Sequence, residues 1–371
     1  MRSSVDITAA VAHKPLADFT IESLELDGPR AGEVLVEIAA VGLCHSDLAA
    51  REGVIPVPLP AVLGHEGAGT VVEVGEGVSK VKAGDKVALT FNYCGQCYNC
   101  TNGAPAYCFQ FLPLNYAGVR LSDGQSPIRS SEGPISGCFF GQSSFASHSI
   151  ATEQNVVKLP DDAPLDLVGP LGCGIQTGAG AVMNSLDAKA GSALLVMGAG
   201  SVGLAGVLGG VVQGCEQIIV LEPHESRRTL AKELGATHAL NPSDGDLAEQ
   251  VRAIAPDGVH NVFDTTGIPG VIESSFGAMA PHAGLGLVGV PGDPNAAINL
   301  SLMQAMIIGI RLFGIIEGDA VPDEFIPRLA KLHTEGKFPF DKMIKKFAFD
   351  QINEAAEAQH KGEVVKVVLT H

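Results

Sequence analysis

Four cysteines within a short stretch could hold a metal ion. Cys94, Cys97 and Cys100 have two residues between neighbours, and Cys108 follows after seven more. Four thiolates at such spacing suit one tetrahedral zinc ion with no open coordination position. The alternatives are four unrelated thiols or a redox pair. We interpret the cluster as a structural zinc site, because a closed set of four thiolates holds a loop and does no catalysis.

A second set of possible ligands is dispersed along the chain. Cys44, His65 and Cys173 offer two sulfurs and one nitrogen, which is a ligand set of catalytic zinc ions that keep a fourth position open. Asp47 and Glu66 lie close to two of these ligands in sequence, where they would orient the ligands and balance charge. Taken singly, each residue has a plain structural interpretation. Their occurrence together with a nucleotide motif is what indicates a site.

A glycine-rich run predicts the binding of a dinucleotide. Gly198–Gly203 has the pattern G-x-G-x-x-G, follows an apolar strand and opens a helix, and this context supports the motif. Its glycines are Gly198, Gly200 and Gly203. Glu222 ends the next strand, and its carboxylate would bind ribose hydroxyls and repel a 2′-phosphate, which favours NAD over NADP. Arg227 and Arg228 lie close by and weaken that preference.

Length and charge exclude several classes of protein. A chain of 371 residues is long enough for two domains. Its formal net charge of −17 argues against nucleic acid as a partner, because an acidic protein gains nothing from neutralising phosphates. Met1–Leu16 lacks the apolar core of a signal peptide, and we interpret the uncharged run Ala190–Cys215 as a buried strand and helix, not as a membrane span. We therefore expect a soluble, cytoplasmic protein with metal-binding cysteines.

Two patterns of secondary structure divide the chain. The first third predicts short strands between turn signals, at Glu33–Val41, Gly69–Val74 and Lys86–Leu89. Beyond Thr177 strands alternate with helices, which implies a parallel doubly wound sheet. The elements expected there are the strands Ala193–Met197, Gln217–Leu221, Asn261–Asp264 and Leu285–Val290 and the helix Ser226–Leu234. A last strand at Val364–Leu369 that joins the first domain would make that domain discontinuous.

With these motifs the sequence resembles the zinc-containing medium-chain alcohol dehydrogenases over nearly its whole length. The matching runs are Gly42–Asp47, Gly64–Gly69, Val78–Asp85, Cys94–Cys108, Gly172–Gly174, Gly198–Gly203 and Gly289–Pro291. The resemblance implies an α/β protein with a GroES-like, mostly β catalytic domain (residues 1–176 and 321–371) and a Rossmann doubly wound parallel-sheet domain (residues 177–320). It also implies NAD and two zinc ions per chain, one catalytic and one structural, and hydride transfer between an alcohol and its aldehyde.

Within the family the chain looks most like the aryl (benzyl) alcohol dehydrogenases. The runs that carry this finer resemblance are Phe140–Phe145, Gly318–Pro327 and Lys337–Asp341. It implies a primary aryl or allylic alcohol as the substrate. Our candidates for the walls of the substrate pocket are Phe91, Phe140 and Leu114.

The resemblance also assigns roles to single residues. His45 falls where the family has a base that binds the pyrophosphate, and Lys366 matches a second basic residue at that group. The remaining cofactor positions are Thr177 and Val202 beside the nicotinamide, Val290 with backbone contacts to its carboxamide, and Arg227 at the ribose.

The proton of the alcohol needs a route to water. Ser46 lies two residues after Cys44, and its hydroxyl could accept this proton because zinc lowers the pKa of a bound alcohol. Many relatives end the relay at a histidine five residues after the first zinc cysteine, where this chain has Ala49. The proton would leave from Ser46 through the cofactor ribose, or through His45.

Other functions stay open on the sequence. A dehydrogenase of S-(hydroxymethyl)glutathione would need basic residues for its anionic substrate, and the sequence does not locate them. A general aliphatic alcohol dehydrogenase shares the same motifs. A zinc-free reductase of the same superfamily would lack the zinc ligands, all of which are present. A non-enzymatic, zinc-stabilised nucleotide-binding protein would hold one zinc ion per chain instead of two.

The oligomeric state depends on one segment. Phe109–Gly137 is long and carries glycines and prolines. In dimeric relatives an insertion here lies near the pocket entrance, so the resemblance favours a homodimer over a tetramer. The sequence fixes neither the physiological substrate nor the direction of the reaction.

Overall fold

The chain is described by a computed structural model over residues 4–131 and 133–371. It divides into two compact units. The first comprises Met1–Cys173, Val321–Lys331 and Asp341–His371, and the second comprises Gly174–Ala320 and Leu332–Phe340.

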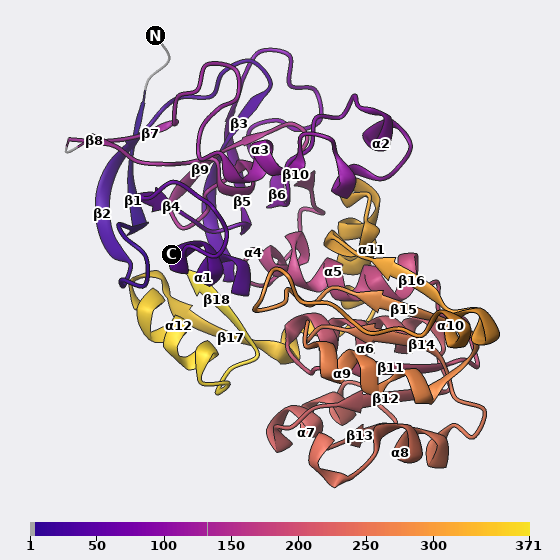
Figure 1. The fold of residues 1–371 in the computed structure, drawn as a ribbon. Coiled ribbons are helices and arrows are strands. Elements are labelled where there is room, and N and C mark those ends of the chain that lie inside the picture. The colour runs from indigo at the N-terminus through magenta and orange to yellow at the C-terminus, as the bar shows by residue number, and fades with distance from the viewer. Residues whose placement is uncertain (1–3, 132) are drawn as a thin grey trace. The chain divides into compact units, whose positions relative to one another are not determined.

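The first unit is mostly β structure (Figure 1). One sheet has the strand order β4-β1-β2-β7-β8, and the other has the order β10-β6-β5-β3-β18-β17 with β9 paired to β3. The strands are β1 (Val5–Ala12), β2 (Thr20–Leu26), β3 (Glu33–Leu43), β4 (Ala61–Val62), β5 (Glu66–Val74), β6 (Lys86–Leu89), β7 (Ile128–Ser130), β8 (Gly133–Pro134), β9 (His148–Thr152), β10 (Val156–Lys158), β17 (Ile344–Ala348) and β18 (Lys366–Thr370). Because β18 pairs antiparallel with β3, the C-terminal strand completes the sheet that begins near the N-terminus.

Short helices connect these strands. They are α1 (His45–Glu52), α2 (Tyr98–Thr101), α3 (Phe111–Tyr116), α4 (Leu165–Val168) and α12 (Ile352–His360), with most of α11 (Pro322–Thr334). Helix α1 begins directly after β3 and ends at Gly53, whose left-handed backbone accommodates the C-cap. This strand-to-helix junction holds the first of the predicted metal ligands.

The second unit contains one parallel sheet of six strands. The strand order is β13-β12-β11-β14-β15-β16. This is the Rossmann order, in which two halves of three strands each meet between β11 and β14. The strands are β11 (Ala193–Met197), β12 (Gln217–Leu221), β13 (His238–Leu240), β14 (Val259–Asp264), β15 (Met279–Leu287) and β16 (Arg311–Gly314). The helices are α5 (Gly174–Gly180), α6 (Ser201–Gln213), α7 (Glu225–Glu233), α8 (Leu247–Ile254), α9 (Pro269–Ser274) and α10 (Leu302–Ile308).

Apolar runs explain why these segments form a buried parallel sheet. Every residue of β11 is buried, as expected for a strand covered on both faces. Helix α6 is likewise buried along most of its length and ends at Gly214 in a left-handed conformation. The uncharged run Ala190–Cys215 is therefore a strand and a helix, as predicted. Among the described residues no helix is both long and apolar enough to cross a membrane.

Strand positions are confirmed more closely than strand ends. The bounds of β6, β11 and β12 are those predicted. The bounds predicted for β15, Leu285–Val290, were wrong: the strand starts at Met279 and ends at Leu287. The reason is that the backbone N–H groups of Val288 and Gly289 both turn to the carbonyl of Asp264, so the chain leaves the sheet before Val290.

A buried ion-pair network ties the 109–137 segment to the first unit. The guanidinium of Arg120 donates twice to the carboxylate of Glu33, at 2.6 and 3.0 Å, and once to Asp27 at 2.7 Å. Burial acts to lower the pKa of Arg120, but the two carboxylates overcome it and raise the pKa. Arg129 also pairs with Asp27, but its side chain is half exposed.

We expect Arg120→Met to lower the free energy of unfolding by about 3 kcal/mol, because removing one partner of a buried pair leaves an uncompensated charge. The matched control Arg129→Met should cost roughly 0.5 kcal/mol, as is usual for an exposed pair. Urea unfolding followed by circular dichroism measures both. Equal losses in the two variants would contradict a special role for the buried arginine.

Candidate active site

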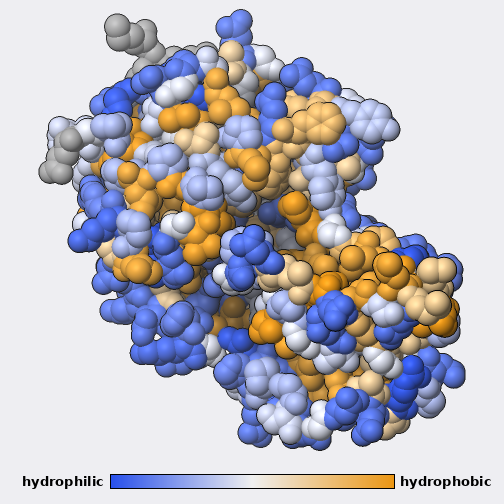
Figure 2. Space-filling model, in the orientation of Figure 1, coloured by the Kyte–Doolittle hydropathy of each residue, from blue (hydrophilic) through white to orange (hydrophobic). Residues whose placement is uncertain are grey.

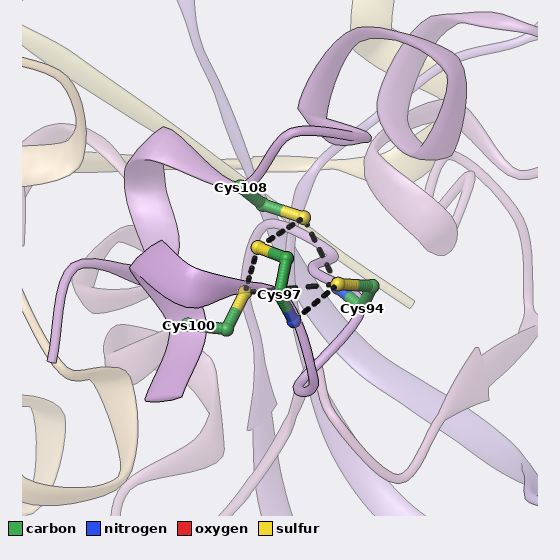
Figure 3. Close-up of side chains that lie close together, drawn as sticks. All are labelled: Cys94, Cys97, Cys100 and Cys108. Carbon is green, nitrogen blue, oxygen red and sulfur yellow. Dashed lines mark hydrogen bonds between the residues drawn. The ribbon is translucent and has the colours of Figure 1, made fainter. Parts of the chain in front are cut away.

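The four clustered cysteines converge on one point (Figure 3). Cys97 precedes α2, Cys100 lies within it, and Cys94 and Cys108 approach from the flanking loops. The Sγ atoms are 3.5 Å apart for Cys97 and Cys100, 3.9 Å for Cys94 and Cys100, and 4.0 Å for Cys97 and Cys108. Tetrahedral zinc with Zn–S bonds of about 2.3 Å requires Sγ–Sγ separations of about 3.8 Å. The cluster therefore fits a zinc ion without rearrangement.

Backbone amides stabilise negative charge on these sulfurs. The N–H of Cys97 donates to the Sγ of Cys94, and the N–H of Cys94 donates to the Sγ of Cys108, each at 3.3 Å. Backbone N–H groups, chiefly that of Cys100, lower the pKa of Cys97 to about 6. Burial instead raises the pKa of Cys100 to about 12. A cation is needed to hold all four sulfurs as thiolates.

The dispersed ligands form a second cluster within the first unit. Cys44 caps α1 at the end of β3, His65 immediately precedes β5, and Cys173 follows a short 3₁₀ turn. One ligand atom from each of these residues and from Glu66 lies within 4.8 Å of the others. The Nε2 atom of His65 is buried and has no hydrogen-bond partner among the described residues. A metal ion would satisfy that nitrogen.

Asp47 aligns two of these ligands. Its buried carboxylate accepts hydrogen bonds from the backbone N–H of Cys44 at 2.9 Å and of Gly64 at 3.0 Å, and it contacts Nδ1 of His65 at 2.7 Å. A proton held on Nδ1 leaves the Nε2 lone pair free for a metal. Burial acts to lower the pKa of His65, but Asp47 and Cys44 together outweigh it and raise the pKa. The thiol of Cys173 hydrogen-bonds to Cys44 and holds its pKa well below the usual range.

Glu66 is paired with a buried lysine. Its carboxylate lies 2.6 Å from Nζ of Lys366, which also donates to the carbonyl of Leu43 at 3.1 Å. Burial raises the pKa of Glu66. A glycine is required at position 42, because a Cβ there would lie 1.9 Å from the Glu66 carboxylate. Lys366 is fully buried in this contact, and its predicted role at the pyrophosphate stays a prediction.

The two candidate proton carriers differ in exposure. Ser46 is partly buried, and its Oγ lies 3.9 Å from the Sγ of Cys44. His45 is exposed at the first turn of α1. Ala49 is buried in the same helix, so the relay histidine of many relatives has no substitute there.

Aromatic rings surround the predicted histidine ligand. The ring of Phe140 stacks on the His65 imidazole at 4.3 Å, and Phe139 meets it edge-on at 5.5 Å. Phe91 is buried in an adjoining group of rings. Leu114 borders a separate cavity of about 300 Å³ whose lining includes none of the four clustered ligands. Phe140 is thus the candidate wall nearest the site.

The glycine motif forms the turn from β11 to α6 in the second unit. Gly203 must be a glycine, because a Cβ there would lie 1.9 Å from the carbonyl oxygen of Gly198. Glu222 is buried, and its carboxylate accepts from the backbone N–H of Ala199 at 2.8 Å and of His224 at 2.9 Å. Its negative charge is therefore fixed against the loop that would hold the pyrophosphate.

The other predicted cofactor residues lie in the same unit. Nε of Arg227 is buried without a hydrogen-bond partner among the described residues, whereas Arg228 donates to the carbonyls of Glu222 and Pro223. Thr177 is buried in α5, Val202 lies in the first turn of α6, and Val290 is exposed beyond β15.

Sequence reasoning overlooked two buried polar residues near the ligands. Gln142 and Thr90 are both buried, and their side chains hydrogen-bond to the backbone of the ligand segments. Gln142 stands inside the run Phe140–Phe145, which was used only as a mark of resemblance. A polar residue between phenylalanines was the available signal.

Comparisons with known proteins agree with this geometry. Residues 30–161 match the alcohol dehydrogenase GroES-like domain, and residues 201–334 match the zinc-binding dehydrogenase domain. A geraniol dehydrogenase from Castellaniella defragrans is 47% identical over 98% of each chain. The crystal structure of benzyl alcohol dehydrogenase from Acinetobacter calcoaceticus has a TM-score of 0.95 and 40% identity over 99% of each chain. That of an alcohol dehydrogenase zinc-binding domain protein from Burkholderia ambifaria has a TM-score of 0.97 and 45% identity over 99% of each chain.

Proposed function

This chain belongs to the zinc-binding alcohol dehydrogenases, and we propose that it transfers a hydride between a primary aryl or allylic alcohol and NAD, yielding the aldehyde, and that it catalyses the reverse reaction. The observation that carries this proposal is the group of Cys44, His65, Glu66 and Cys173, in which Nε2 of His65 is buried and unpartnered. In this proposal Cys44, His65 and Cys173 hold the catalytic zinc ion, and the cluster Cys94–Cys108 holds the structural one.

The residues of the chain would have distinct tasks. Bound zinc would supply stabilisation of the negative charge that develops on the alcohol oxygen, and the nicotinamide would accept the hydride. Asp47 fixes the orientation of His65, and Lys366 neutralises Glu66 inside the site. Ser46 would take the proton of the alcohol.

Two relatives support the substrate class. Geraniol is an allylic alcohol and benzyl alcohol an aryl alcohol, and the proteins named for them are 47% and 40% identical to this chain. In both substrates a π system adjoins the reacting carbon. The Phe140 ring stacked on His65 offers such a substrate an aromatic surface beside the metal site.

We expect NAD reduction with benzyl alcohol and geraniol to be at least tenfold faster, in kcat/KM, than with ethanol. This ratio corresponds to about 1.4 kcal/mol of preferential binding of the transition state. A zinc chelator should abolish all three rates. Rates with ethanol that equal or exceed the others would keep the zinc mechanism and overturn the substrate class. No rate with any of them, but turnover of S-(hydroxymethyl)glutathione, would favour that substrate instead.

A carboxylate at the ribose side supports NAD rather than NADP. Two backbone N–H groups fix the carboxylate of Glu222 beside the glycine loop. A 2′-phosphate would meet that carboxylate. Arg227, with an unpartnered Nε, would bind the ribose. The backbone N–H groups that open α6 would face the pyrophosphate.

The exposed His45 suits one of the two proton routes. Its position on the surface of α1 would let its imidazole pass the proton from Ser46 to solvent. On that route His45→Gln should alter the pH–rate profile of alcohol oxidation, because the variant lacks the group that passes the proton to solvent. Steady-state kinetics over a range of pH measure it. An unchanged profile would exclude the histidine and leave the ribose route.

The edge of the Rossmann sheet supports a homodimer. Among the described residues β16 stands at the end of the strand order, next to β15, and an edge strand can pair with a strand of another chain. Beside it, α10 exposes Leu302 by 81%, Met306 by 77% and Ile307 by 75%, and Figure 2 shows hydrophobic surface over this helix. A patch of this kind on a sheet edge fits a two-fold interface with a second copy of the chain.

Sedimentation equilibrium should give a mass of twice the 38.3 kDa chain. Met306→Glu combined with Leu302→Glu should shift the enzyme to monomer, because charges would be buried in the interface. Leu112→Glu, at an exposed position of the first unit, should leave the mass unchanged. A monomeric parent enzyme, or a dimer that survives the double change, would contradict this interface.

The cysteines fit a reducing compartment. All eight are free of disulfide bonds, and six of them belong to the two metal clusters. Such thiols persist where glutathione keeps them reduced. The proposal therefore includes the cytoplasm as the location.

A further inference from the structure

Gln142 makes four hydrogen bonds with its buried side-chain amide. Nε2 donates to the carbonyl of His65 at 2.9 Å and to that of Thr90 at 3.0 Å. Oε1 accepts from the backbone N–H of Gly67 at 3.2 Å and from the hydroxyl of Ser144. Both amide hydrogens and both oxygen lone pairs are used. The partners also fix which end is oxygen, since two carbonyls face one end and two donors the other.

These bonds reach segments that carry different metal ligands. His65 and Gly67 flank Glu66, so Gln142 hydrogen-bonds to this segment on both sides of Glu66. Thr90 in turn donates its hydroxyl to the carbonyl of Gly172 at 2.7 Å, directly before Cys173 in the chain. Gln142 and Thr90 therefore connect the His65 segment to the Cys173 segment. No side-chain atom of either residue is itself among the clustered ligands.

The backbone around Gln142 is held in an unusual conformation. Cys138, Phe140 and Ser143 all have positive φ angles, at 58°, 51° and 56°. Such angles are rare outside glycine and persist only where surrounding contacts enforce them. Here the hydroxyl of Ser143 donates to the carbonyl of Val62 at 2.7 Å, and that of Ser149 donates to the carbonyl of Gln142 at 2.5 Å. The amide is thus fixed before any metal binds.

We propose that Gln142 is a positioning residue that sets the spacing between the His65 and Cys173 ligands and thereby governs how firmly the catalytic metal is held. It complements Asp47, which joins His65 to the Cys44 segment. Together with the Thr90 hydroxyl, the two buried side chains connect all three ligand segments. The inference rests on the ligand set proposed above, and it adds a residue that touches neither metal nor substrate.

The test compares release of zinc to a chromogenic chelator from the purified holoenzyme. Gln142→Leu removes all four hydrogen bonds. Gln142→Glu keeps the shape but cannot donate to the two carbonyls while ionised. We expect both to release one of two zinc ions at least tenfold faster than the parent enzyme, since losing a partner that orients a ligand weakens metal affinity about 10- to 100-fold. The other zinc ion should leave at the parent rate.

A matched control separates positioning from loss of a buried amide. Asn115 is also fully buried, and its side chain bonds, among the described residues, to the backbone of Asn92 and Phe111, outside the segments of Cys44, His65 and Cys173. Asn115→Leu should leave the release of the catalytic zinc ion at the parent rate. Thr90→Val, which removes only the hydroxyl bond to Gly172, should accelerate release, and its effect should be less than multiplicative with that of Gln142→Leu.

Cobalt substitution gives a second readout. The visible bands of cobalt in the catalytic site should shift in Gln142→Glu, because the ligand geometry changes, and should not shift in Asn115→Leu. Parent-like zinc release and spectra in both Gln142 variants would overturn the inference, as would equal acceleration in Asn115→Leu. If Gln142→Leu does not fold, Gln142→Glu and Thr90→Val carry the test. A parent enzyme with only one zinc ion per chain would instead overturn the proposed ligand set.

Discussion

The carboxylate of Asp47 joins chain segments that local structure alone would leave independent. It accepts from the N–H that starts α1 and from the N–H before β5, and it holds the imidazole between them. A fully buried charge is tolerated only when its lone pairs are satisfied, and here three donors surround it. The position of Cys44 relative to His65 therefore follows from satisfying one buried anion, and the rest of the site is assembled around that pair.

The remaining ligand depends on neutral hydrogen bonds. Cys173 follows a 3₁₀ turn and does not lie in a strand. The position of Cys173 is therefore set by the contacts of the preceding residue, Gly172. The hydroxyl of Thr90 and, through it, the amide of Gln142 supply that contact. The left-handed residues around Gln142 each cost about 1–2 kcal/mol of conformational energy. The contacts made by the inward-pointing Gln142 amide offset this strain.

How much the sequence could predict depended on the range of the interactions. The glycine turn, the four clustered cysteines and the strands β6, β11 and β12 follow from local spacing and apolar runs, and they lie where expected. Pairing the dispersed ligands required the family resemblance, because Cys173 is 108 residues from His65 in the chain. Three of the four partners of the Gln142 amide lie 52 to 77 residues away in the chain, and no period or motif encodes such contacts. The predicted end of strand β15 was wrong for a related reason, since this end is set by a hydrogen bond to Asp264 on the neighbouring strand.

The charges inside the site explain why a divalent metal suits it. Glu66 and Lys366 neutralise one another in the buried interior, and three hydrogen-bond donors stabilise the carboxylate of Asp47. As thiolates, Cys44 and Cys173 would add two further negative charges. Like charges this close in a medium of low dielectric repel strongly, so both sulfurs lose their protons together only when two positive charges arrive. One zinc ion supplies those charges and would bind the unpartnered Nε2 of His65. The electrostatic design therefore selects a doubly charged, nitrogen- and sulfur-binding ion before any substrate enters.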